Sequence, residues 1–168
     1  MNTANRLMLA SAVCLAMAAC SHKVKETPAA DNGNGMNGAT TGGIAETGKY
    51  GPGDLDTDAC LRQRVVYFDF DQDTLKPEFQ ATIACHAKYL RDRPEARMTL
   101  EGNADERGTR EYNLGLGERR GNAVSAVLGG SAGQVNVVSY GEEKPVCLDS
   151  GEDCWAKNRR VEIVYTAK

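Results

Sequence analysis

An arginine within the apolar stripe of a predicted helix is the first residue whose position points to chemistry. A helix advances 100° per residue, and we count from Tyr112 at 0°. Arg120 then falls at about 80°, between Leu116 at about 40° and Val124 at about 120°. A guanidinium on a buried face is costly unless an opposite charge lies near it. The sequence therefore predicts that Arg120 has an acidic partner or an anionic ligand.

The nearest acidic candidate lies in the loop before this helix, which reads GNADERG at residues 102–108. This loop leaves the C-terminal end of a predicted strand, where open α/β sheets place their ligands. A carboxylate and a guanidinium on opposite sides of a pocket suit a zwitterion. Asp105 would hold an ammonium, and Arg120 would bind a carboxylate through two N–H groups. The spacing is equally compatible with an internal Asp105–Arg120 salt bridge and no ligand.

The elements around these residues predict an α+β domain of order β-α-β-α-β-β. A first helix begins at Pro77 and ends before Pro94. A second helix has Thr109 as its N-cap and runs to about Leu128, where two glycines stop it. Two β-α-β units imply that both helices pack on the sheet. The predicted strands are rich in β-branched and aromatic residues and cover residues 65–70, 97–101, 135–140 and 161–165.

The first twenty residues have the pattern of a secretion signal that ends at a cysteine. Arg6 is followed by thirteen apolar or small residues (7–19), which are too few to cross a bilayer as a mature helix. The segment MAAC at residues 17–20 resembles the lipobox of bacterial lipoproteins. This resemblance implies cleavage before Cys20 and acylation of Cys20, and Ser21 in place of Asp favours the outer membrane. The alternative for Cys20 is a buried structural cysteine.

We expect residues 1–19 to be a signal peptide, residues 20–58 a flexible tether and residues 59–168 one folded domain. The stretch 31–54 is dense in Gly, Asn and Thr and shows no apolar period. Such a stretch cannot bury enough apolar surface to offset the entropy lost on ordering. A flexible chain of about 40 residues has a root-mean-square span of roughly 35 Å. The tether would thus let a membrane-bound domain search the space beside the membrane.

Composition excludes some function classes. Lys and Arg number 20 against 23 Asp and Glu, for a net charge of -3, so a strongly cationic nucleic-acid binder is excluded and no nucleic-acid partner is expected. Six cysteines indicate an oxidising compartment. The two histidines, His22 and His86, leave little for a histidine metal site, and His86 lies on the apolar stripe of the first helix, as a structural histidine would. We expect no metal and no cofactor. We also expect no catalytic residues, because the chain has no recognisable nucleophile–base pair.

Four segments carry a recognisable pattern: YFDFD (67–71), LEGNADERGTREYNLGLGERRGNAV (100–124), VVSYGEEKP (137–145) and AKNRRVEIVY (156–165). Together they resemble the peptidoglycan-associated lipoprotein (Pal) family, whose folded part is an OmpA-like domain. The resemblance implies a mixed four-stranded sheet with helices packed on one face. It also implies non-covalent binding to meso-diaminopimelate in the peptide stems of peptidoglycan, a place in the Tol–Pal system of cell division, and TolB as a partner.

The resemblance also assigns residues. The aspartate and arginine of the family fall on Asp105 and Arg120, and Asp71, Phe70 and Asn103 are implied as further ligand contacts. Many members have His where Asn103 stands, and Asn can form hydrogen bonds but cannot titrate near neutral pH.

Two other features of the family pattern bear on the structure. Gly117 stands where Ser is common, which we expect to loosen the helix slightly. The segment Asn158-Arg159-Arg160 is expected either to touch peptide or glycan carboxylates or to be a solvated strand end.

The remaining cysteines form two candidate pairs. OmpA-like domains often carry a disulfide in the loop before the last strand, which implies a Cys147–Cys154 bond. Cys60 and Cys85 are left over, and a bond between them requires the N-terminal segment to cross the outer side of the first helix. Zinc is the competing interpretation, but the spacing resembles no standard zinc finger.

The sequence therefore predicts a lipid-anchored protein of the outer membrane, with its domain in the periplasm, that ties the membrane to peptidoglycan. Two alternatives stay open. One is a lipid-anchored cell-wall enzyme, and the other is an OmpA-like lipoprotein of another envelope assembly, such as a secretion or motor complex.

Overall fold

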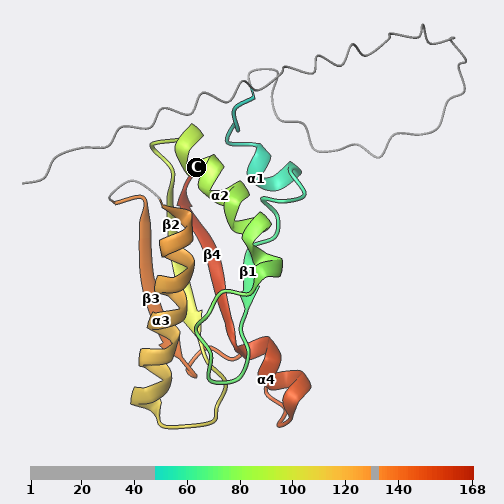
Figure 1. Cartoon of the computed structure of the whole chain (residues 1–168), viewed down its shortest axis with the longest axis vertical. Helices are drawn as coiled ribbons and strands as arrows, with labels where there is room; N and C mark the ends of the chain where they lie inside the picture. Colours follow the sequence, from blue (N-terminus) through green and yellow to red (C-terminus); the bar gives the residue numbers. More distant parts are fainter. Residues whose placement is uncertain (1–47, 130–132) are drawn as a thin grey trace, which may run out of the picture. The chain divides into compact units, whose positions relative to one another are not determined.

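The computed structural model describes residues 48–129 and 133–168. The expected signal peptide, Cys20 and most of the expected tether lie outside these residues. In the described part of the chain, a four-stranded mixed sheet is covered by α2 and α3 on one face, which confirms the α+β fold (Figure 1). The elements in chain order are α1 (Asp54–Thr57), β1 (Val65–Tyr67), the 3₁₀ turn η1 (Pro77–Phe79), α2 (Gln80–Asp92), β2 (Arg97–Asn103), α3 (Arg110–Leu128), β3 (Val135–Gly141), α4 (Glu152–Asn158) and β4 (Arg160–Ala167).

The sheet topology brings two loops to the same edge. The strand order is β1-β4-β2-β3, with β2 and β3 parallel and β4 antiparallel to both β1 and β2. Strands β1 and β2 therefore run in the same direction, and their C-terminal ends lie at one edge. The segments that follow them, residues 68–76 and 104–109, carry most of the ligand contacts expected from the sequence.

The core lies between the sheet and helices α2 and α3. Helix α3 begins at Thr109, whose side chain accepts a hydrogen bond from the backbone N–H of Tyr112 at 3.2 Å. It ends at Gly129, which adopts a left-handed conformation with φ of 56°. The sheet contributes Val66, Met98, Leu100, Val161 and Ile163 to the core, and the helices contribute Ile83, Leu90, Val124 and Leu128.

The folded part begins earlier than expected, so the predicted boundary at residue 59 is wrong. Tyr50 and Leu55 are buried and belong to the core, and helix α1 lies inside the segment expected to be tether. The backbone N–H of Tyr50 donates to Oδ2 of Asp92 at 2.9 Å, and Lys88 donates to the carbonyl of Gly48 at 2.6 Å. The two apolar residues stand among Gly, Asp and Pro without a period, which is why the pattern concealed them.

Two disulfides and one histidine tie the elements together. Disulfides join Cys60 to Cys85 and Cys147 to Cys154, and the first of them fixes the N-terminal segment to α2. His86 is fully buried, with Nδ1 2.8 Å from the Tyr165 hydroxyl and Nε2 2.9 Å from the carbonyl of Gln63. Burial lowers the pKa of His86, so its neutral form is favoured.

Close packing of α3 on the sheet depends on glycine. A Cβ on Gly117 would lie 2.4 Å from Oγ of Ser139 and 2.8 Å from the carbonyl oxygen of Gly102. Gly117 therefore permits the contact between α3 and strands β2 and β3, a role that the sequence alone did not indicate.

Two element boundaries also differ from the prediction. Strand β1 ends at Tyr67, three residues earlier than predicted. Helix α4 lies in a segment that was predicted to be a loop. Within residues 48–129 and 133–168, no helix combines the length and apolar character needed to span a membrane.

Candidate functional site

A cavity of about 230 Å³ opens at the sheet edge where β1 and β2 end. Four of the five residues expected to contact ligand line it: Phe70, Asp71, Asp105 and Arg120. They come from the segment after β1, the loop after β2 and the middle of α3. The structure thus brings together in one pocket residues that lie up to fifty positions apart in the chain.

Arg120, in the middle of α3, lines the pocket and is fully buried. Its guanidinium donates to three backbone carbonyls, with Nε to Gln72 at 2.8 Å, Nη1 to Asn103 at 2.8 Å and Nη2 to Asp69 at 3.1 Å. A guanidinium has five N–H donors, so one remains on each terminal nitrogen. Burial, together with the positive charge of Arg159, lowers the pKa of Arg120 to about 10, which leaves it charged at neutral pH.

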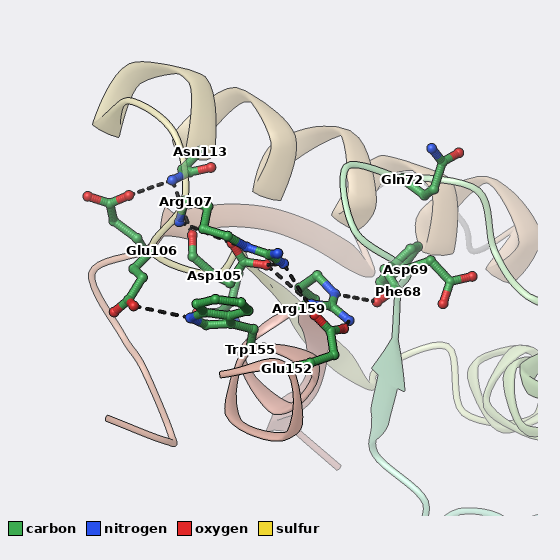
Figure 2. A network of polar contacts seen from close by, with 12 residues as sticks. Phe68, Asp69, Gln72, Asp105, Glu106, Arg107, Asn113, Glu152, Trp155 and Arg159 are labelled. Atoms are coloured by element: carbon green, nitrogen blue, oxygen red, sulfur yellow. Dashed lines mark hydrogen bonds and ion pairs between the residues drawn. The ribbon is translucent and has the colours of Figure 1, made fainter. Parts of the chain in front are cut away.

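Asp105 is also buried, with 4% of its surface exposed, and it pairs with two arginines other than Arg120. Arg107 binds it through Nε at 3.1 Å and Nη2 at 2.7 Å, and Nη1 of Arg159 lies 3.3 Å from Oδ2 (Figure 2). Burial alone raises the pKa of this carboxyl, but the hydrogen bonds from Arg107 and Arg159 bring the pKa below its usual value. The internal Asp105–Arg120 salt bridge considered from the sequence is therefore replaced by other pairings.

The segment after β1 presents Phe70 and Asp71 to the pocket through an unusual turn. Asp71 has a positive φ of 57°, a conformation that costs energy for a residue with a side chain. Arg120 bonds the carbonyls on either side of it, those of Asp69 and Gln72, and so holds the turn in place. The Asp71 carboxylate accepts a hydrogen bond from the hydroxyl of Tyr112, and Phe70 is 53% exposed at the rim.

Asn103, the fifth expected contact, does not line the pocket. Its side chain is 1% exposed and Nδ2 donates to the carbonyl of Glu101 at 2.9 Å. Asn103 contributes through its backbone, because its carbonyl accepts from Nη1 of Arg120. The expectation of a direct side-chain contact with ligand is corrected accordingly.

Sequence reasoning missed Arg107 and did not foresee that Arg159 pairs with Asp105. Arg159 is not a solvated strand end, because its side chain is only 5% exposed. It donates to the carbonyl of Phe68 at 3.0 Å and to Oε1 of Glu152 at 2.5 Å (Figure 2). The guanidinium of Arg107 lies between two aromatic rings, 3.9 Å from the centroid of Phe70 and 4.1 Å from that of Trp155. A helix at 152–158, which was not expected, is what brings Arg159 and Trp155 to this edge.

Comparison with known proteins places the chain in a family. A model of the OmpA family matches residues 67–159. The peptidoglycan-associated lipoprotein of Pseudomonas putida is 44% identical over 163 residues, which cover 91% of this chain and 93% of that protein. This chain belongs to the OmpA family, among its peptidoglycan-associated lipoproteins. The family resemblance found in the sequence is thereby confirmed.

Solved structures agree with this membership. The crystal structure of the peptidoglycan-associated lipoprotein from Burkholderia pseudomallei is 44% identical, with a TM-score of 0.65 over 67% of this chain and 98% of that chain. The cell wall anchor of the T6SS from Pseudomonas aeruginosa is 26% identical, with a TM-score of 0.52 over 64% of this chain and 90% of that chain. The same fold therefore occurs in a T6SS cell wall anchor as well as in a peptidoglycan-associated lipoprotein.

Proposed function

We propose that this chain tethers the outer membrane to the cell wall by binding the meso-diaminopimelate residue of peptidoglycan stems non-covalently. The observation that carries the proposal is a single cavity lined by a buried carboxylate, Asp105, and a buried guanidinium, Arg120. The free end of diaminopimelate bears an ammonium and a carboxylate on one carbon. It therefore presents the charge pair that such a cavity complements.

Each charged group of the diaminopimelate terminus has a complementary side chain in the pocket. The ligand carboxylate would accept the two N–H groups that Arg120 does not give to backbone carbonyls. The ammonium would bind the carboxylate of Asp105, and Asp71 also lines the pocket as a second acidic residue. Buried charged groups bind a complementary ligand well because the protein has already met the cost of ordering them.

The rest of the functional proposal concerns how the chain is anchored to the outer membrane and which protein partner it has. Acylated Cys20 would hold the outer membrane, and the domain would face the periplasm and bind the wall. As in the Tol–Pal system, TolB would be a partner during envelope constriction at division. Support for this part comes from family membership and from the lipobox pattern at residues 17–20.

Co-sedimentation with sacculi tests the binding proposal. The purified protein should pellet with diaminopimelate-type sacculi and should fail to pellet with lysine-type walls, whose third stem residue lacks the terminal carboxylate. Asp105→Asn keeps the shape of the side chain and removes its charge, so it should reduce pelleting strongly. Equal pelleting with both wall types, or by Asp105→Asn as by the unaltered protein, would refute the pocket assignment.

The same experiment addresses the enzyme alternative. Release of soluble muropeptides during incubation would support a hydrolase, and pelleting without release supports a binding module. His86 is unsuited to act as a general base, because both of its ring nitrogens are hydrogen-bonded inside the core.

Membership of another envelope assembly is the second alternative, and the similarity to a T6SS cell wall anchor keeps it in view. Capture of partners by the intact protein separates the two, since recovery of TolB is expected here. The anchor is tested by Cys20→Ser, which should release the protein from membranes. Continued membrane association of that variant would contradict lipidation at Cys20.

A further inference from the structure

The acceptor positions of Asp105, which the proposed function assigns to the ligand's ammonium, are already engaged. Oδ1 accepts from the backbone N–H and from Nε of Arg107, both at 3.1 Å. Oδ2 accepts from Nη2 of Arg107 at 2.7 Å and from Nη1 of Arg159 at 3.3 Å. A carboxylate offers about four lone-pair positions. An ammonium that binds Asp105 must therefore replace one of these donors.

The two arginine side chains differ in how firmly they are held. The side chain of Arg159 is 5% exposed and is fixed by the carbonyl of Phe68 and the carboxylate of Glu152. The side chain of Arg107 is 30% exposed and itself lines the pocket. Arg107 is thus the donor that a ligand can displace, while Arg159 stays and keeps Asp105 ionised and in position.

Glu152 offers Arg107 a second carboxylate to pair with. Its Nη2 already lies 3.7 Å from Oε2 of Glu152, an exposed carboxylate at the start of α4. The rings of Phe70 and Trp155 lie on the guanidinium and can keep it between them while it shifts toward Glu152. The guanidinium would therefore exchange one carboxylate for another without entering bulk water.

We propose that Arg107 competes with the ligand's ammonium for Asp105 and shifts to Glu152 when the ligand displaces it. This inference rests on the proposed function. A ligand that carries only an ammonium must displace Arg107 and gains nothing from Arg120. A ligand that carries only a carboxylate binds Arg120 and does not compete for Asp105. Arg107 therefore weakens binding of every ammonium ligand by a similar factor, and only a zwitterionic end offsets that cost through its contact with Arg120.

Three small probes of matched chain length separate these cases. They are meso-diaminopimelic acid, pimelic acid, which lacks the amines, and 1,5-diaminopentane, which lacks the carboxylates. Binding of each to the purified unaltered protein, Arg107→Gln and Arg107→Lys is measured by calorimetry. The melting temperature of each variant is recorded to show that it is folded.

Arg107→Gln should bind meso-diaminopimelic acid about threefold to tenfold more tightly, because a partly exposed ion pair no longer competes. Its affinity for 1,5-diaminopentane should rise by a similar factor, and its affinity for pimelic acid should stay the same or fall. Arg107→Lys, which keeps a competing cation, should change these affinities less. A loss of affinity for both meso-diaminopimelic and pimelic acid would overturn the proposal, because Arg107 would then be a cation that binds the ligand carboxylate. Unchanged affinities would overturn it as well.

The role of Glu152 is tested by a double-mutant cycle. Glu152→Gln should weaken binding of meso-diaminopimelic acid in the unaltered background by a larger factor than in the Arg107→Gln background, since the acceptor for displaced Arg107 matters only when Arg107 is present. Equal factors would remove the shift toward Glu152 from the account. If the unaltered protein binds neither meso-diaminopimelic acid nor sacculi, the proposed function itself fails, and that result differs from a failure confined to Arg107.

Discussion

Arg120→Ala should destabilise the whole domain as well as prevent binding. The substitution removes a donor from the carbonyls of Asp69, Gln72 and Asn103, of which that of Asp69 keeps the backbone N–H of Gln72 at 3.2 Å, and it opens a void beside the pocket. A buried group without its partner costs about 1–3 kcal/mol. Water from the pocket can meet part of this need, and removing a desolvated charge returns some free energy. We therefore expect the free energy of unfolding to fall by about 3 kcal/mol.

The neighbouring residue provides a matched control. Arg119 lies on the same helix, but its side chain is 48% exposed and its ion pair with Asp73 is at the surface. Arg119→Ala should therefore cost less than about 1 kcal/mol. Urea unfolding followed by the fluorescence of Trp155, the single tryptophan of the chain, measures both variants. If Arg120→Ala costs no more than Arg119→Ala, the three carbonyl contacts do not hold the turn and the account of the pocket floor is wrong.

Three further predictions concern stability. Gly117→Ala should lower the free energy of unfolding by about 1–3 kcal/mol through overpacking, whereas Gly115→Ala, whose Cβ would meet only a flexible arginine tip, should be neutral or stabilising; equal melting temperatures for the two variants would contradict the close packing of α3. Removing the Cys60–Cys85 disulfide by a double Ser substitution should cost about 3 kcal/mol for a loop of this length, and early proteolysis at residues 48–58 should reveal that the N-terminal segment has loosened. Because burial lowers the folded-state pKa of His86, the unfolded chain binds this proton first; stability should be complete above about pH 6.5 and decline as pH falls toward the folded pKa, and His86→Asn should flatten that decline in urea titrations between pH 7 and 5.

Much of the fold could be predicted because local signals and tertiary packing agree. The N-cap at Thr109 and the glycine stop after Leu128 are both found where the pattern placed them. The boundary near residue 59 failed because the burial of Tyr50 depends on contacts with α2, and that of Leu55 on the same tertiary core, which no local pattern encodes. Helix α4 was missed for a related reason, since its seven residues are too few to show a helical period.

The sequence predicted which charged residues line the candidate site, but it did not predict which of them form ion pairs with one another. An arginine in an apolar stripe is visible from a helical wheel, and the structure buries Arg120 completely. The partners of Asp105 could not be deduced in the same way. Arg107 is two residues away in a loop of undefined conformation, and Arg159 arrives from a segment 54 positions later through an unexpected helix. Asn103 was misplaced because a residue at the end of a strand can face either side of the sheet.

The central claim is that Asp105 and Arg120 bind the two charges of one diaminopimelate terminus, and a crystal structure with a diaminopimelate-containing stem peptide tests it most directly. The account predicts the ligand carboxylate within hydrogen-bonding distance of the terminal nitrogens of Arg120, and the ammonium within the same distance of Asp105. A peptide bound elsewhere, or bound in the pocket with its charges reversed or away from these two side chains, would contradict it.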